Sequence, residues 1–208
     1  MMEEIFDSWN SLYTGHPALL HKDEVEIIEQ DNQALFTNLS FKVEEALSIP
    51  SRELDAFDFW SAISKKNCDG AVLVKRDFDL FDLVLVEMKS SFETETIYEA
   101  KEQIIHSLPK INILLNTIDC YSKIKIRKSY GIVVSLSPTD ERLDWIKGQS
   151  MLPRSQWGNN TCGLTLFLDR YMNVNSSNWK MNPTLLPNNF DIYYYDSTGA
   201  KMTIELPV

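Results

Sequence analysis

Two short apolar runs on either side of a charged turn constrain the fold of this chain most strongly. The first run is Ala71-Val-Leu-Val74 and the second is Leu83-Val-Leu-Val86, with Asp77-Phe-Asp79 as a turn between them. The second run has no polar position, so both of its faces are expected to be buried, as in a central strand of a sheet. The pattern therefore predicts two neighbouring strands, over residues 69–75 and 82–90.

Charged residues stand at the ends of both predicted strands. Residues i and i+2 of a strand point to the same face, so Glu87 and Lys89 project together while Met88 points away. If the two strands pair, Asp69 joins them. Mg²⁺ prefers hard oxygen ligands and keeps several waters, so one or two carboxylates can hold it. A bound metal activates water, and a nearby lysine stabilises charge on a phosphate. We therefore expect a site that hydrolyses phosphodiesters.

This arrangement resembles the PD-(D/E)XK superfamily of restriction-endonuclease-like nucleases. Asp69 matches the aspartate of that motif, and Glu87-Met88-Lys89 matches (D/E)-x-K. The resemblance implies that Asp69, Glu87 and the carbonyl of Met88 bind Mg²⁺ or Mn²⁺, and that Lys89 is the catalytic lysine. It also implies a metal-dependent nuclease, a hydrolase acting as an endonuclease on DNA. It covers roughly residues 40–136.

The chain departs from the family pattern at two positions. Cys68 stands where a proline often precedes the aspartate. Some branches carry Gln-x-x-x-Tyr in the helix after the motif; here Gln103 matches the glutamine, but Ser107 stands at the tyrosine position. We include Gln103 among the catalytic candidates, as a residue that supports the site.

The resemblance implies an α/β (α+β) fold with a restriction-endonuclease-like αβββαβ core, in which helices flank a mixed central sheet. Apolar residues at steps of three and four predict helix over residues 23–47, ended by Pro50. The family often places a glutamate on the helix before its first strand, and Glu44 and Glu45 are both candidates. One further strand is then needed between residues 55 and 66.

Later segments predict the remaining elements. Thr96 and Glu99 fit a capping box that opens a helix, with a kink or a second helix after Pro109. The other expectations are a strand over 130–135, loop over 148–163, a strand over 164–168, and a hairpin of strands 190–195 and 201–206. We thus divide the chain into residues 1–140, with acidic N-terminal helices and the nuclease-like core, and 141–208, a β-rich C-terminal extension of the same domain.

The most basic stretch of the chain supplies candidate nucleic-acid contacts. Lys123, Lys125, Arg127 and Lys128 occur without an acid between Cys120 and Gly131. Three of them alternate with isoleucines, so they can share one face of an extended segment and contact a phosphate backbone. The alternative is a charged edge strand that guards against aggregation.

The net charge of −10 opposes a simple nucleic-acid binder, which usually has a basic surface. Residues 1–60 hold 13 acids and three bases and thus carry the whole net charge, which leaves the motif region balanced. Two alternatives follow. The chain is a non-catalytic interaction protein on the same fold, with its acidic N-terminal half against a basic partner, or it is a nuclease subunit that needs a partner for DNA binding.

Cysteine usage and hydropathy suggest the compartment. Three widely spaced cysteines form no metal motif, which favours a reduced, cytoplasmic setting. The acidic start lacks the basic region of a signal peptide, and no apolar stretch approaches the roughly 20 residues of a membrane span. We expect no membrane partner. A homodimer is compatible with cutting both strands of a duplex.

Overall fold

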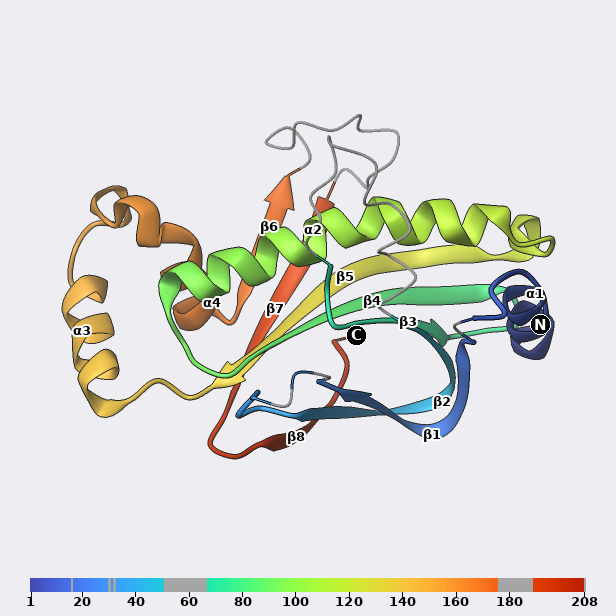
Figure 1. The fold of residues 1–208 in the computed structure, drawn as a ribbon. Helices are drawn as coiled ribbons and strands as arrows, with labels where there is room; N and C mark the ends of the chain where they lie inside the picture. Colours follow the sequence, from blue (N-terminus) through green and yellow to red (C-terminus); the bar gives the residue numbers. More distant parts are fainter. Residues whose placement is uncertain (16, 30, 32, 51–66, 176–188, 208) are drawn as a thin grey trace.

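A computed structural model describes residues 1–15, 17–29, 31, 33–50, 67–175 and 189–207 of the chain. Its described part is a mixed α+β structure in which helices flank an open mixed sheet of eight strands (Figure 1), so this level of the predicted fold is confirmed. The elements in chain order are α1 (Met2–Leu12), β1 (Leu19–Ile28), β2 (Asn38–Pro50), β3 (Gly70–Lys75), β4 (Leu80–Lys89), α2 (Thr94–Thr117), β5 (Lys125–Leu136), α3 (Asp140–Ser150), α4 (Thr161–Asp169), β6 (Tyr171–Asn175), β7 (Asn189–Ser197) and β8 (Lys201–Ile204).

The strands follow the order β1-β2-β3-β4-β5-β7-β6, and β8 pairs with β2 in parallel. From β2 to β5 the successive pairings are antiparallel, antiparallel and parallel. A parallel pair needs a crossover connection, and α2 provides it between β4 and β5. β7 extends the sheet in parallel beside β5, and β6 is antiparallel to β7.

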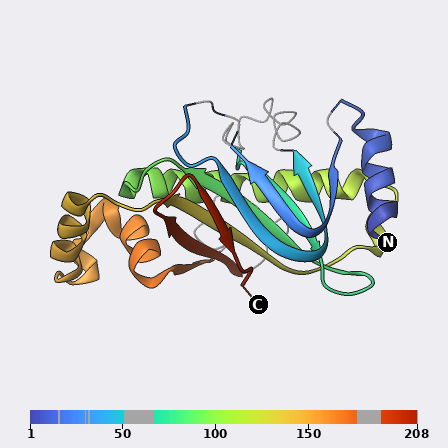
Figure 2. The ribbon, with the colours of Figure 1, turned by 90° about the horizontal axis from the view of Figure 1, so that it is seen from below.

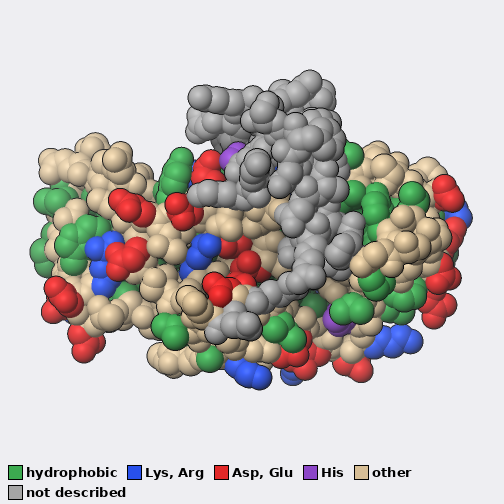
Figure 3. Space-filling view, in the orientation of Figure 1, with side chains coloured by type: hydrophobic (Ala, Val, Ile, Leu, Met, Phe, Trp, Pro, Cys, Tyr) green, Lys and Arg blue, Asp and Glu red, His purple; other side chains and the backbone are tan. Residues whose placement is uncertain are grey.

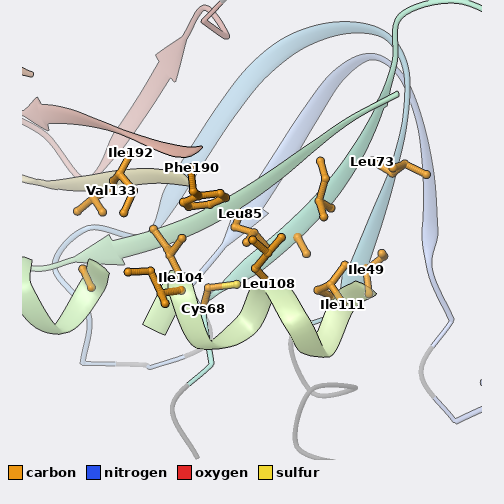
Figure 4. Packing of buried hydrophobic residues seen from close by; sticks show 14 of the residues in the cluster. Ile49, Cys68, Leu73, Leu85, Ile104, Leu108, Ile111, Val133, Phe190 and Ile192 are labelled. Atoms are coloured by element: carbon orange, nitrogen blue, oxygen red, sulfur yellow. The ribbon is translucent and has the colours of Figure 1, made fainter. Parts of the chain in front are cut away.

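The core lies on both faces of the central strands. Helix α2 covers one face, where Leu85 of β4 points toward Ile104 and Leu108 of the helix (Figure 4). The other face packs against the β1–β2 hairpin and β8, which lie in front of α2 when the molecule is seen from below (Figure 2). Residues Phe81–Met88 of β4 are all buried, so the prediction of a central strand with two buried faces is confirmed.

The helix predicted over residues 23–47 is wrong, because β1 and β2 form an antiparallel hairpin there. Val25 and Ile27 are buried between exposed glutamates, and Leu39 and Phe41 alternate with more exposed polar residues. This is the period of two of a strand with one face buried. The apparent helical spacing of three and four residues connected apolar residues that belong to two different strands. Glu44 and Glu45 lie on β2 rather than on a helix.

Helix α2 also differs from its prediction. It begins at Thr94, and Glu93 at its N-cap makes no side-chain capping bond, so Thr96 and Glu99 lie inside the helix and are not a capping box. The helix continues unbroken through Pro109 for 24 residues. Proline costs one backbone hydrogen bond, and the long buried face of α2 outweighs that cost.

The C-terminal third contains more helix than predicted. Residues 164–168 lie in α4, and residues 148–163 contain the end of α3, two short 3₁₀ turns and the start of α4. Gly163 permits α4 to approach α2 closely, because a Cβ there would lie 2.6 Å from Thr94 Cα.

The predicted C-terminal hairpin does not form. Its two segments are β7 and β8, but β7 pairs with β5 and β6 while β8 pairs with β2. After β7 the chain crosses to the β2 side of the molecule, where Ala200 O accepts from Thr37 N at 2.8 Å. The strand expected between residues 55 and 66 lies outside the described residues. Among those described, no helix is long and apolar enough to cross a membrane.

Candidate active site

Asp69 and Glu87 meet where β3 begins and β4 ends. The β3–β4 pairing reaches Gly70 opposite Val86, so one step further along the register Asp69 stands opposite Glu87. The backbone N–H of Asp69 donates to Glu87 Oε2 at 3.2 Å, and the backbone N–H of Met88 donates to Asp69 Oδ2 at 2.6 Å. These two bonds fix both carboxylates at the same end of the central strands.

Lys89 and Gln103 complete the group. Lys89 Nζ donates to Glu87 Oε1 and, at 2.8 Å, to Gln103 Oε1 from α2. Met88, between Glu87 and Lys89, turns its side chain into the core on the opposite face of the sheet. The structure therefore brings together the four side chains that the sequence singles out as catalytic, and Figure 3 shows acidic and basic side chains close together near the middle of the face that carries α2.

The two carboxyl groups are held in an environment that disfavours their charge. Glu87 is 1% exposed, and burial raises its pKa to about 8; the Asp69 charge acts in the same direction, while Lys89 lowers the pKa by its charge and its hydrogen bond. Burial also raises the pKa of Asp69, to about 7, while the Met88 N–H acts in the opposite direction. A buried pair of like charges is stabilised by a bound proton or by a cation.

Glu29, just beyond the end of β1, is a third carboxylate that the sequence analysis missed. Its charge raises the pKa of both Asp69 and Glu87, and protonated Asp69 donates a hydrogen bond to it. Glu29 continues the alternation of Val25 and Ile27, so recognition of β1 as a strand would have placed it on their face. The helical pattern assumed for this region hid that signal.

The donor set fits a hard divalent cation. Carboxylate oxygens are the ligands that Mg²⁺ and Mn²⁺ prefer, and this group has more carboxylates than ammonium groups. In the described part of the chain, no cluster of three or more His, Cys, Asp or Glu side chains has the arrangement of a metal site. A cation here would thus be held by Asp69, Glu87, the Met88 carbonyl and water.

The other candidates for the family's helical glutamate lie elsewhere. Glu44 is exposed on β2 and lines a surface hollow of about 630 Å³ with Asp23, Lys42 and Arg76. Glu45 pairs with Lys75 Nζ at 2.5 Å. Glu29, in contrast, lies beside Asp69.

The basic stretch begins at the opposite end of the same strands. Lys125 pairs with Leu80 at the start of β4, whereas Lys89 pairs with Ser135. At about 3.3 Å per residue, the bases of β5 lie roughly 16–23 Å from the level of Glu87 along the strand. Each of the four bases is paired within the chain: Lys123 with Glu4, Lys125 with Asp79, Arg127 with Asp82 and Lys128 with Asp191.

Among the described strands, β5 has no partner on the side opposite β4 along its basic half. Lys125 to Ser129 pair with β4, and β7 joins on the other side from Tyr130 onward.

Comparisons of this chain with protein-family models, with curated proteins and with solved structures each gave no match. The interpretation of the site therefore depends on its own geometry and chemistry.

Proposed function

We propose that this protein is a metal-dependent nuclease of the restriction-endonuclease-like type, which hydrolyses phosphodiester bonds in DNA with Mg²⁺ or Mn²⁺. One observation carries the proposal: Asp69, directly before β3, stands opposite Glu87 of β4, and Lys89 bridges Glu87 to Gln103. A buried carboxylate pair next to an oriented ammonium group is costly to stability and is typical of a functional site.

The topology around the site supports the same proposal. The strands β2, β3, β4 and β5 pair antiparallel, antiparallel and parallel, with α2 between the parallel pair. We assign β2, β3, β4, α2 and β5 to the βββαβ part of the αβββαβ core. In this assignment β2 is the first strand of the core, the position for which we expected a strand between residues 55 and 66. Strand β1 and strands β6–β8 are additions to that core.

The roles of the residues follow from their atoms. Asp69, Glu87 and the carbonyl of Met88 would hold the metal, which when bound lowers the pKa of a water and offsets charge on the phosphate. Lys89 lies beside Glu87 and can orient the attacking water or donate to the scissile phosphate. Gln103 accepts from Lys89 Nζ and thereby keeps that ammonium group on the carboxylate side of the site.

A second candidate function is favoured by the ion pairs of the basic stretch. Lys123, Lys125, Arg127 and Lys128 are each already paired with an acid of the chain. A protein whose bases are engaged in this way has little positive field to attract DNA. The chain would then be a nuclease subunit whose partner supplies the DNA-binding surface. The remaining alternative, an interaction protein on the same fold, makes no use of the carboxylate pair.

A cleavage assay tests the proposal. Plasmid and single-stranded DNA are incubated with wild type, with Glu87→Ala/Lys89→Ala and with Lys42→Ala/Glu44→Ala, in Mn²⁺, Mg²⁺ or EDTA. The second double variant removes the same two charges from the exposed surface of β2. We expect metal-dependent cutting by wild type and the β2 control, and none by the site variant.

Thermal unfolding with and without Mn²⁺ separates the alternatives if no cutting is seen. A ligand that binds only the native state raises its stability. Stabilisation of wild type but not of Glu87→Ala/Lys89→Ala would favour a nuclease subunit that lacks its partner. Equal behaviour of all three proteins would leave the interaction protein as the remaining interpretation and overturn the metal site.

A further inference from the structure

The segment that leads into Asp69 is held by one face of helix α2. Strand β3 begins at Gly70, so residues 67–69 lie outside the described strand pairing and depend on side chains for their position. Gln103, Ser107 and Lys110 are spaced by four and three residues, which places them on the same side of the helix. We call these three residues the α2 ladder.

Each member of the α2 ladder makes a hydrogen bond to this segment. Gln103 Nε2 donates to the carbonyl oxygen of Asn67 at 3.0 Å, and the N–H of Cys68 donates to Ser107 Oγ at 2.8 Å. Lys110 Nζ donates to Asn67 Oδ1. Two consecutive residues before Asp69 are therefore tied to the helix at backbone and side chain.

The α2 ladder also contacts Lys89, through Gln103. Ser107 Oγ donates to the carbonyl oxygen of Gln103 at 2.8 Å, and Gln103 Oε1 accepts from Lys89 at 2.8 Å. From Lys89 the chain runs back through Met88, whose N–H donates to Asp69. These hydrogen bonds connect Lys89 through α2 to the segment that leads into Asp69. The Met88 N–H then connects Asp69 back to β4.

The burial of the ladder makes its bonds costly to lose. Ser107 and Lys110 are both 0% exposed, and Cys68 is 1% exposed. A buried N–H or ammonium that loses its partner bears the full cost of desolvation, whereas bonds at the surface can be replaced by water. Apolar residues would fill these helix positions at lower cost if packing were their only role.

We propose that Ser107 and Lys110 are positioning residues of the active site, which act through Asn67 and Cys68 to hold Asp69 opposite Glu87 and Lys89. The inference deepens the proposed nuclease function and rests on it. The hydrogen bonds of Ser107 go to Cys68 and Gln103, and that of Lys110 goes to Asn67, so both residues act on the chain that carries Asp69.

The test is amide hydrogen exchange followed by NMR in metal-free protein, for wild type, Ser107→Ala, Lys110→Met and the control Ile111→Val. Ile111 is equally buried on α2 and its truncation loosens the core without touching the ladder. The probes are the amides of Met88 and Asp69, which donate to the site carboxylates, against the amide of Leu85 within β4. We expect the Met88 and Asp69 amides to exchange about tenfold faster in Ser107→Ala and Lys110→Met, with Leu85 unchanged.

Amide exchange tests the positioning role separately from the nuclease function. If Met88 and Asp69 exchange no faster in the ladder variants than in Ile111→Val, the positioning role is overturned; if Ser107→Ala does not fold, Lys110→Met decides. Where wild type cleaves DNA, the ladder variants should lower kcat at unchanged KM, and an unchanged kcat would overturn the role as well. A wild type that neither cleaves nor binds Mn²⁺ refutes the nuclease function, while the exchange data still decide whether α2 positions Asp69.

Discussion

The backbone amide of Met88 donates to the carboxylate of Asp69 at 2.6 Å, so the residue between Glu87 and Lys89 also holds the acid of the neighbouring strand. The side chain of Met88 cannot take part, because it is buried on the opposite face. The backbone of β4 thus carries Glu87 and Lys89 and also holds Asp69. Removal of the Asp69 carboxylate would remove this contact together with the charge.

Replacement of Lys89 by alanine should abolish cleavage and leave the protein folded. Loss of the ammonium group removes the main group that opposes the charge of Glu87, so the pKa of Glu87 rises further and the carboxyl takes up a proton. The fold then contains no unpaired buried charge. Lys101→Ala is the control, because Lys101 lies in α2 and pairs with Glu102 rather than with Glu87. Cleavage rates and circular dichroism check this prediction, and a fully active Lys89→Ala protein would remove Lys89 from the mechanism.

The raised pKa values predict how stability depends on pH in the absence of metal. In the unfolded chain Asp69 and Glu87 have ordinary pKa values of 3.8 and 4.5, and folding raises them to about 7 and about 8. Between these limits the folded state binds more protons than the unfolded state. The contribution of the pair is therefore fully present at low pH, falls as pH rises through the range from about 4 to about 8, and is lost above it.

A metal ion should reverse this loss. It replaces the proton between the carboxylates, so stabilisation by Mn²⁺ should be larger at about pH 8 than at about pH 6, where protons compete for the same oxygens. Thermal unfolding of wild type and of Asp69→Asn/Glu87→Gln across this range isolates the contribution of the pair. Equal pH profiles for the two proteins would contradict the raised pKa values.

Glu29 should contribute to the raised pKa of Asp69. Glu29→Gln removes one negative charge but keeps a carbonyl oxygen that can accept from the Asp31 N–H, as Glu29 Oε1 does at 3.0 Å. The pKa of Asp69 should fall toward its ordinary value, because the Glu29 carboxylate raises it both by its charge and by its hydrogen bond. Carbon-13 NMR titration of the Asp69 carboxyl measures this shift. Glu24→Gln, an exposed change on β1, should leave the titration of Asp69 as it is in wild type.

The motif and its strands could be predicted because they are local. The apolar runs of β3 and β4 have both faces buried, and the step from Glu87 to Lys89 depends only on strand geometry. Glu29 was missed because the helix expected over residues 23–47 hid the alternation of β1, and its position beside Asp69 also depends on how the β1–β2 hairpin folds over the sheet. Long-range pairing of that kind has no local signature in the sequence, and the separation of β7 from β8 was missed for the same reason.

The exposed bases Lys123 and Lys125 provide the last test, which concerns DNA binding. Their side chains are 55% and 68% exposed; their partner Glu4 is exposed and their partner Asp79 is partly exposed. Ion pairs at such sites contribute at most about 1 kcal/mol, so a phosphate can replace the carboxylate at little cost. Lys123→Ala/Lys125→Ala should therefore leave the thermal stability unchanged and weaken DNA binding uniformly across sequences.

The dependence of binding on salt distinguishes direct phosphate contacts from other effects. Each phosphate contact contributes about one unit to the slope of log K against log salt, so the double substitution should reduce that slope by about two. Lys201→Ala, an exposed change on β8, should not alter the slope. Fluorescence anisotropy with labelled duplex DNA in EDTA measures binding without cleavage. An unchanged slope in the double variant would mean that these bases serve only their ion pairs and would favour a partner protein as the source of the DNA contacts.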